Sequence, residues 1–389
     1  MAGQTAPRST SIDLLRGIVM VIMALDHVRD YFHADSFISD PTDLATTTVP
    51  FFLTRWITHY CAPIFVFLSG TSAWIVHQRM GTKATSLFLL KRGLWLIVVE
   101  IVLIRIGWTF NPTLLRFGLQ VIWAIGASMV VLSALIHLPW RAILVVGLVL
   151  VFGHNALDGI HFDGAWWWKM LHDQGRVEAA GLIVFFAYPL LPWIGTMALG
   201  YCFGTFYGAS YSGETRRRAL TGLGLGAILL FMVVRWTNLY GDTEPWAPQG
   251  SAAFTVLSFL NLTKYPPSLL YLLMTLGPAM LFLAWSENIR GWLARALIVF
   301  GRVPFFYYVL HLYLIHAGAM LAAQLTGFGW QSMVTEGRVN LYDPLKGYGF
   351  SLPVTYLVWI AVVLALYPLC KWFDRVKSSN RQIWWLRYL

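Results

Sequence analysis

Long apolar stretches recur along nearly the whole chain, and they constrain the fold more than any other feature. Each is about 20 residues long, enough for a helix to cross a hydrocarbon core of about 30 Å. Of the 389 residues, 58% are hydrophobic and only 12% are charged, so these stretches lack the polar faces of soluble helices. The sequence therefore predicts an all-α, polytopic membrane helix bundle that forms a single domain over residues 1–389.

Apolar windows and helix breakers indicate about ten membrane helices. They are expected at residues 12–33, 50–77, 86–109, 115–137, 141–155, 181–207, 217–238, 267–285, 294–322 and 351–372. The stretch at 141–155 is short for a full crossing. The Gly301-Arg302-Val303-Pro304 segment is expected to interrupt the ninth helix.

Charges in the connecting loops predict the orientation of the bundle. If the N-terminus is cytoplasmic, every inner loop carries lysine or arginine, as the positive-inside rule requires. An even number of crossings then returns the C-terminus to the cytoplasm, where Trp384 and Trp385 are expected at the membrane surface. These loops also explain the net charge of +10, so nucleic acid is not an expected partner.

Ionisable residues crowd the end of the first predicted helix, in MALDHVRDYFHAD (residues 23–35). Such groups are costly inside a membrane and usually line a cavity or a site. Helical spacing places Asp26, Asp30 and His33 on one face, and His27 lies three positions before Asp30. Because a carboxylate can orient an imidazole and support its protonated form, we expect His27 or His33 to act as a general base, oriented by Asp26 or Asp30.

Three segments resemble a known family. RSTSIDLLRG (8–17), CAPIFVFLSG (61–70) and LQVIWAIGAS (119–128) are similar to the catalytic domain of heparan-alpha-glucosaminide N-acetyltransferase and its bacterial relatives, and YYVLHLYLIH (307–316) adds to the likeness. The resemblance implies a membrane enzyme that moves an acetyl or acyl group from cytosolic acetyl-CoA to a sugar or amino-sugar acceptor outside. The catalytic histidine would then serve as general base or as acyl carrier.

The same resemblance ranks the two histidines. When this chain is aligned with the lysosomal members without gaps from Arg16 and Gly17 onward, an asparagine of those members aligns with His27. Their histidine aligns with His33 only if a gap is allowed. The broader transmembrane acyltransferase group instead keeps a histidine at the position of His27. We therefore place His27 first and His33 second.

Four further polar residues at membrane depth are expected to contact substrate. His59 lies near the outer end of the second predicted helix, and Gln120 lies in the outer half of the fourth. His311 falls inside the ninth, with Tyr307 one turn earlier on the same face. A histidine in a membrane needs a partner or a cavity, so this pair is a candidate for binding the acyl group or the acceptor.

Coenzyme A carries phosphates and needs cations at the inner surface. Arg16, Lys91, Arg92 and Arg302 are the candidates, and Arg16 precedes His27 by about 16 Å of helix. No metal site is predicted, because the ten histidines are scattered and no HExxH occurs.

A proton-coupled secondary transporter is the alternative function, since such proteins also use ionisable residues in membrane helices. No second copy of the SIDLLRG to LDH block is present in the C-terminal half, which favours the enzyme. The expected partners are membrane lipid, acyl-CoA and a carbohydrate acceptor, and a homodimer is compatible with the sequence. The expected location is a bacterial cytoplasmic membrane.

Overall fold

The computed structural model describes residues 10–113, 115–337, 339, 343–380, 382, 383 and 386. The start of the RSTSIDLLRG segment, at Arg8 and Ser9, lies outside the described residues, and so do Trp384 and Trp385.

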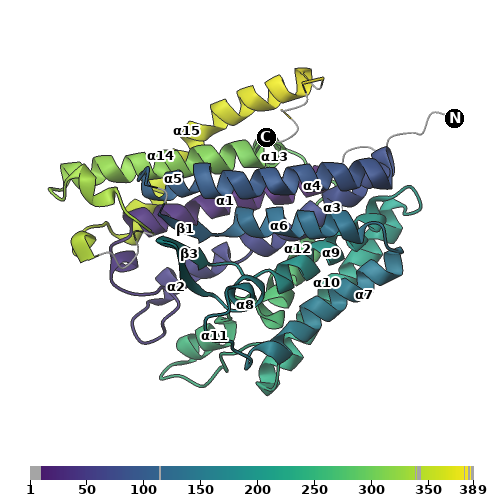
Figure 1. Cartoon of the computed structure of the whole chain (residues 1–389), viewed down its shortest axis with the longest axis horizontal. Coiled ribbons are helices and arrows are strands. Elements are labelled where there is room, and N and C mark those ends of the chain that lie inside the picture. Colours follow the sequence, from purple (N-terminus) through teal and green to yellow (C-terminus); the bar gives the residue numbers. More distant parts are fainter. Residues whose placement is uncertain are drawn as a thin grey trace.

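Helices make up most of the described chain (Figure 1). The α-helices are α1 (Thr10–Phe32), α2 (Val49–Thr58), α3 (Cys61–Met80), α4 (Thr82–Val99), α5 (Arg105–Thr109), α6 (Val121–Leu135), α7 (Trp140–Gly153), α8 (Trp166–Leu171), α9 (Leu191–Phe203), α10 (Gly213–Thr237), α11 (Ala252–Leu260), α12 (Leu269–Trp285), α13 (Trp292–Arg302), α14 (Pro304–Leu325) and α15 (Leu352–Ser379). Short helical turns join several of them: η1 (Ala34–Phe37), η2 (Glu100–Ile104), η3 (His154–Leu157), η4 (Gly204–Tyr207), η5 (Trp330–Met333) and η6 (Asp343–Leu345).

Length and composition agree with a helical membrane protein. In the described residues, five helical stretches are long and apolar enough to cross a membrane: Val49–Met80, Trp140–Leu157, Gly213–Thr237, Pro304–Leu325 and Leu352–Ser379. Two shorter apolar helices, α6 and α12, lie among them. The number of crossings and the side on which each end of the chain lies stay predictions.

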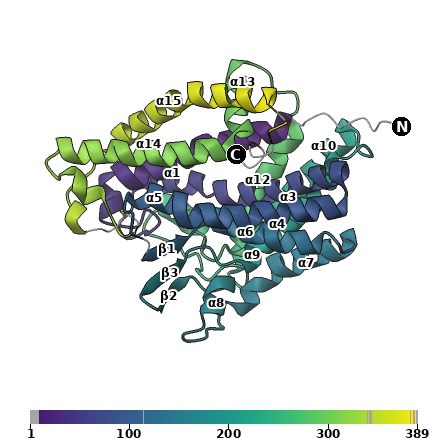
Figure 2. The ribbon, with the colours of Figure 1, turned by 45° about the horizontal axis from the view of Figure 1, so that its top comes forward.

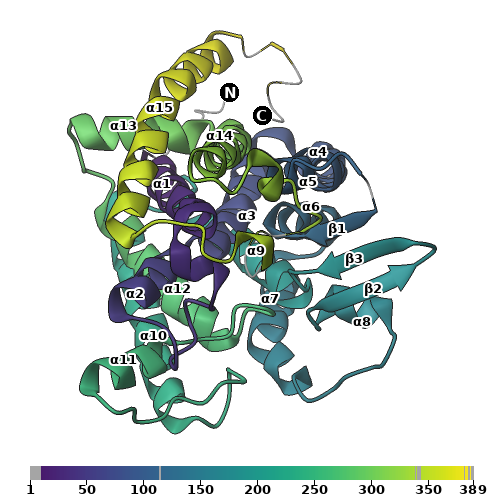
Figure 3. The ribbon, with the colours of Figure 1, turned by 90° about the vertical axis from the view of Figure 1, so that its left-hand side faces the viewer.

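The first helix, α1, lies at the centre of the bundle. Viewed from one end, it is surrounded by helices from all parts of the chain, including α3, α14 and α15 (Figure 3). Most of its side chains are buried, and these include the polar residues His27, Arg29 and Asp30. The polar end of α1 is therefore enclosed by protein, which removes the energetic penalty of placing charges against lipid.

Glycines let several pairs of helices cross closely. A Cβ on Gly17 of α1 would overlap the backbone of Leu297 in α13, and one on Gly301 would overlap Asp13. Gly70 and Gly200 make the same kind of contact between α3 and α9. Such small-residue contacts are the usual way for helices to pack in a membrane, where no hydrophobic effect drives them together.

Two predicted helices are each divided into two. The helix expected at 50–77 consists of α2 and α3, which are separated at His59 and Tyr60. The helix expected at 294–322 is divided at Val303, directly before Pro304, as the proline predicts. In contrast, the helix expected at 86–109 continues from α4 through the π-helical turn η2 into α5.

A small sheet corrects the expectation of an all-α fold. It contains β1 (Arg116–Leu119), β3 (Leu182–Phe186) and β2 (Gly175–Ala179) in that order, with β1 parallel to β3 and β3 antiparallel to β2. The helices predicted at 115–137 and 181–207 therefore begin as strands, and α6 and α9 start later. For β3, whose sequence is LIVFF, the reason is that a short apolar run rich in β-branched and aromatic residues fits either a strand or a helix, and only pairing with a distant segment decides between them. The sheet lies at one end of the bundle, with α8 beside it (Figure 2).

Candidate functional site

Two histidines from opposite ends of the chain meet in the middle of the bundle. The Nδ1 atom of His27 in α1 lies 2.8 Å from Nε2 of His311 in α14, and the rings stack with their centroids 4.8 Å apart. Both side chains are buried, at 7% and 0% exposure. The rings of Trp108 and His27 pack in a T-shaped arrangement, with their centroids 4.7 Å apart. The position of His27 is therefore fixed by contacts with α14 and α5.

The hydrogen bonds of His311 define where the protons lie. Its Nδ1 is 2.9 Å from the backbone oxygen of Tyr307, and a carbonyl can only accept, so Nδ1 carries the proton. In the neutral ring, Nε2 then accepts, and the hydrogen that it accepts comes from Nδ1 of His27. Neutral His27 consequently has its lone pair on Nε2. An imidazole held in one tautomer in this way has the form of an oriented base.

The carboxylates next to His27 bind arginines. Asp26 accepts from Arg55 at 2.8 and 2.9 Å and from the Thr58 hydroxyl at 2.8 Å. Arg29, which is buried, lies 2.7 Å from Asp26 and 2.5 Å from Asp30. The two acids and two arginines thus form a charge-balanced cluster beside the histidine, in place of the simple acid and imidazole pair that the sequence suggested. Paired charges of this kind can stay ionised away from bulk water.

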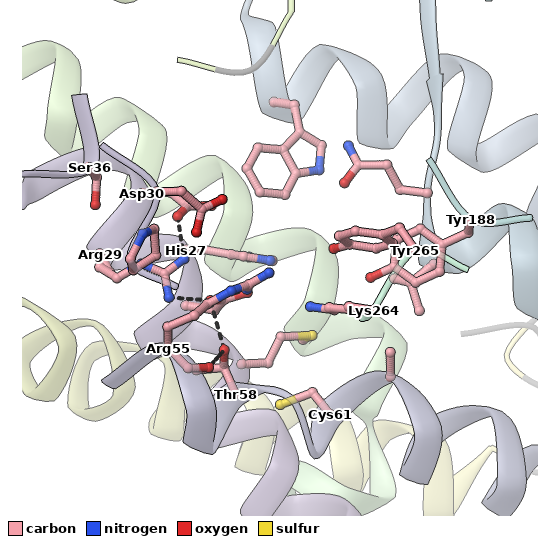
Figure 4. A pocket seen from close by; sticks show the side chains of 18 of the residues that line it. His27, Arg29, Asp30, Ser36, Arg55, Thr58, Cys61, Tyr188, Lys264 and Tyr265 are labelled. Carbon is pink, nitrogen blue, oxygen red and sulfur yellow. Dashed lines mark hydrogen bonds and ion pairs between the residues drawn. The ribbon is translucent and has the colours of Figure 1, made fainter. Parts of the chain in front are cut away.

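A cavity of about 330 Å³ opens in front of this cluster. His27, Arg29 and Arg55 line one side, and Lys264, Tyr265 and Tyr188 face them from the other (Figure 4). The cavity therefore offers both charged groups and aromatic rings to whatever occupies it.

Two more cavities adjoin the first and extend in different directions. One of about 90 Å³ shares Met23, Phe65, Val121 and Tyr308 with it, is mostly apolar, and has Arg92 in its wall. The other, of about 330 Å³, shares Trp108, Gln120 and Tyr265 with it and is lined further by β1 and β3. The cavity that His27 lines thus adjoins a narrow apolar recess and a wider cavity bordered by the sheet.

His33 occupies different surroundings. Its ring stacks on Phe51 with centroids 4.5 Å apart, and its Nδ1 accepts a hydrogen bond from the backbone N–H of Asp35 at 3.1 Å. It lines a separate, open cavity with Phe350 and Tyr356. Burial lowers the pKa of His33, which keeps the ring neutral, and the nearby Asp35 opposes this only in part. The two histidines that the sequence left as alternatives therefore do not share a pocket.

The other three residues expected to contact substrate take different places. Gln120 lines both the central cavity and the wider cavity bordered by β1 and β3. Tyr307 is fully buried and stacks on His311 with centroids 5.1 Å apart, so it supports the histidine pair. His59 is buried where α2 meets α3, and its backbone oxygen accepts from the Tyr271 hydroxyl at 2.7 Å.

The four cations expected to bind coenzyme A do not lie together in one site. Arg92 lines the apolar recess, and Lys91 beside it is exposed. Arg16 contacts Ser72 at 3.0 Å and Asp13 at 3.5 Å, and Arg302 lies within 4 Å of Asp13 and Asp374. Arg92 is therefore the cation best placed to meet a ligand in that recess.

Arg55 and Lys264 belong to the site, although the sequence did not mark either as a candidate. Arg55 was recognisable in principle, because it lies inside a predicted membrane helix, where a charge needs a partner. Lys264 lies in the connection between α11 and α12, and nothing in its sequence context separates it from other loop cations. Burial and the neighbouring Arg55 guanidinium lower the pKa of Lys264.

These features define the class of protein: a helical membrane protein with a polar, histidine-containing pocket enclosed between its helices. Residues 8–237 match the family model described as heparan-alpha-glucosaminide N-acetyltransferase, catalytic, and this match covers more than half of the chain. The chain belongs to that family, which confirms the resemblance seen in the sequence and indicates a transmembrane acetyltransferase. No curated protein of similar sequence was found. His311 and Lys264 lie beyond the matched range, and the fold brings them to His27.

Proposed function

We propose that this protein transfers an acetyl group from acetyl-CoA to an amino or hydroxyl group of a sugar acceptor, with His27 as the general base. The observation that carries the proposal is the chain of hydrogen bonds from His27 through His311 to the Tyr307 carbonyl, which leaves the lone pair of His27 on Nε2 beside the central cavity. A base held in one tautomer at a pocket is what such a transfer requires.

The reaction needs one proton transfer in each direction. Nε2 of His27 removes a proton from the acceptor nitrogen or oxygen, which attacks the thioester carbonyl carbon of acetyl-CoA. The tetrahedral intermediate then collapses with cleavage of the carbon–sulfur bond. The thiolate of coenzyme A leaves and takes the proton from His27, so the enzyme returns to its starting state.

The surrounding charges support the protonated histidine. His27 becomes an imidazolium during the reaction, and the carboxylates of Asp26 and Asp30 lie in the same cavity wall. The arginines that pair with these acids hold them in place. His311 keeps accepting the Nδ1 hydrogen, so the ring does not have to turn when its charge changes.

The cavities suggest how the two substrates reach His27. The pantetheine arm of acetyl-CoA is narrow and largely apolar, which suits the recess that Arg92 borders. A sugar carries many hydroxyl groups and apolar ring faces, which suit the carboxylates, Lys264 and aromatic rings of the central cavity and Gln120 at its outer boundary. Donor and acceptor would thus approach from different directions, in keeping with a cytosolic donor and an acceptor on the far side of a membrane.

The test is acetyl transfer by the purified protein in proteoliposomes, with acetyl-CoA and a panel of amino sugars. Free thiol and acetylated sugar are measured together. Ser69→Phe fills the recess and should raise the KM for acetyl-CoA at least about tenfold, as steric loss of a binding site predicts. Leu94→Phe on the exposed side of α4 is the matched control.

Two results would contradict the proposal. One is that no thiol is released with any acceptor although the protein is folded. The other is that a solute crosses the vesicle membrane without acetyl-CoA, which would favour the proton-coupled transporter.

A further inference from the structure

Outside the pocket, three metal-ligating side chains meet where α7 ends. His154, Asp158 and His172 each offer one ligand atom, and these atoms all lie within 4.8 Å of one another. His154 begins η3, Asp158 follows that turn, and His172 comes directly after α8. Local sequence does not indicate this cluster, because the two histidines are separated by a loop and a helix of unrelated composition. We propose that this cluster is a binding site for a divalent transition metal, with zinc as the fitting ion.

The buried state of His154 is the first argument. The residue is 2% exposed, and in the described part of the chain neither of its ring nitrogens has a hydrogen-bond partner. Buried polar atoms are normally paired, and an unpaired one is unfavourable unless something else satisfies it. A metal ion bound to one ring nitrogen would satisfy it and would explain why a histidine is buried there.

The spacing of the other two ligands is the second argument. Nε2 of His172 lies 3.5 Å from Oδ1 of Asp158. Two ligands on a tetrahedral zinc, each about 2.1 Å from the ion, stand about 3.4 Å apart. The rings of His154 and His172 have centroids 5.7 Å apart, and their planes form an angle of 51°. Small side-chain rotations therefore bring three ligands onto one ion.

The groups around the cluster hold the ligands in position. Asn155 donates to Oδ2 of Asp158 at 2.8 Å, which leaves Oδ1 toward His172. Trp168 stacks on the His172 ring with centroids 5.3 Å apart. Nε2 of His172 also donates to the backbone oxygen of His154 at 2.8 Å, and metal binding at this atom would displace that proton. Outer contacts that orient histidine and carboxylate ligands are typical of metal sites.

The choice of metal follows from the ligands. Two imidazoles and one carboxylate suit zinc and related ions, whereas calcium and magnesium prefer sites made of oxygen atoms. Three protein ligands leave a fourth position for water. The site would tie the end of α7 to α8 and so to Gln174, which lines the wider cavity bordered by β1 and β3. This inference does not depend on the proposed acetyl transfer.

The test uses the full chain, purified in detergent, treated with a chelator and then titrated with zinc. Zinc bound per chain is measured by elemental analysis, and cobalt is used as a coloured substitute whose absorption reports a tetrahedral site. We expect one zinc per chain and a higher thermal unfolding midpoint with zinc than without it.

Matched variants locate the site. His154→Leu removes the unpaired ring and should weaken zinc binding more than about 100-fold, because even loss of an outer-contact residue typically weakens binding 10- to 100-fold. His161→Ala is the control: this histidine lies in the same loop, is exposed and contacts Asp173. It should bind zinc as the unmodified protein does.

If His154→Leu fails to fold, Asp158→Asn gives the same comparison at a half-buried position. The proposal is overturned if the unmodified protein takes up no zinc, or if His154→Leu and Asp158→Asn both bind zinc as tightly as the unmodified protein does.

Discussion

His27, in α1, and His33, directly after it, lie six residues apart but have different surroundings. His27 is held by a second histidine and faces a cavity rich in charges, whereas His33 lies against Phe51 and caps a short turn. Both are buried, so burial alone does not separate them. The difference lies in what each ring can reach: a charged cavity between the helices for His27, and a separate open cavity lined by Phe350 and Tyr356 for His33. Proximity to the acids of the first helix therefore does not separate the two histidines, whereas the residues that line each cavity do.

The largest expected effect is on catalysis by His27. His27→Ala should lower kcat/KM for acetyl transfer by about 10³-fold, because a general base contributes 10²- to 10⁴-fold. His33→Ala should lower it less than about tenfold, through stability alone. Steady-state kinetics on both variants measures this. If both variants lost the same fraction of kcat/KM, the proposed difference in role between His27 and His33 would be wrong.

The next effect is on the stability of the charge cluster. Asp26→Asn removes the carboxylate that binds Arg55 and leaves Arg29 with Asp30 alone, and breaking a buried ion pair costs about 3–5 kcal/mol. Because the Asp26 side chain is 15% exposed, we expect a loss near the lower value, about 3 kcal/mol. Equilibrium unfolding in detergent is the measurement. Asp35→Asn, on the exposed side of η1, should change the free energy by less than about 0.5 kcal/mol.

A smaller effect is expected at His311, a positioning residue. His311→Gln removes the ring that fixes the tautomer of His27, and loss of such support should lower kcat about 10- to 100-fold. The pH at which kcat/KM falls on the acid side should also move, which a merely structural role would not cause. Leu314→Ala, on an exposed face of the same helix, is the control. An unchanged pH profile in His311→Gln would argue against the histidine pair.

The smallest effect concerns pH and His33. Burial lowers the pKa of His33, so the folded protein keeps the ring neutral while the unfolded chain takes up a proton below about pH 6.5. Stability should therefore decrease as the pH falls through this range. His33→Phe, which cannot be protonated, should show a weaker decrease between pH 7.5 and pH 5 in thermal unfolding. A steeper decrease in the variant would show that His33 is protonated in the folded state.

Much of the bundle could be predicted from local sequence. The positions of α1, α7, α10, α12 and α15 follow from apolar runs of the right length, and Pro304 marks the division between α13 and α14. The strands were missed, since LIVFF at 182–186 is equally suited to a helix until β1 pairs with it. Glu100 and Arg105 also fit the local rule that buried charges need partners, and both bind backbone groups. Glu100 accepts from the Trp123 N–H, and Arg105 donates to the carbonyls of Asn111, Thr113 and Arg116.

By itself the sequence determined that the chain forms membrane helices, that polar residues gather at the end of the first one, and that His27 is a candidate base. These properties depend on the composition and spacing of neighbouring residues. Only the tertiary structure decided that His27 pairs with His311, that Asp26 binds Arg55, and that His33 lies elsewhere. The physical reason is that each of these contacts joins different elements, so it depends on how the helices cross.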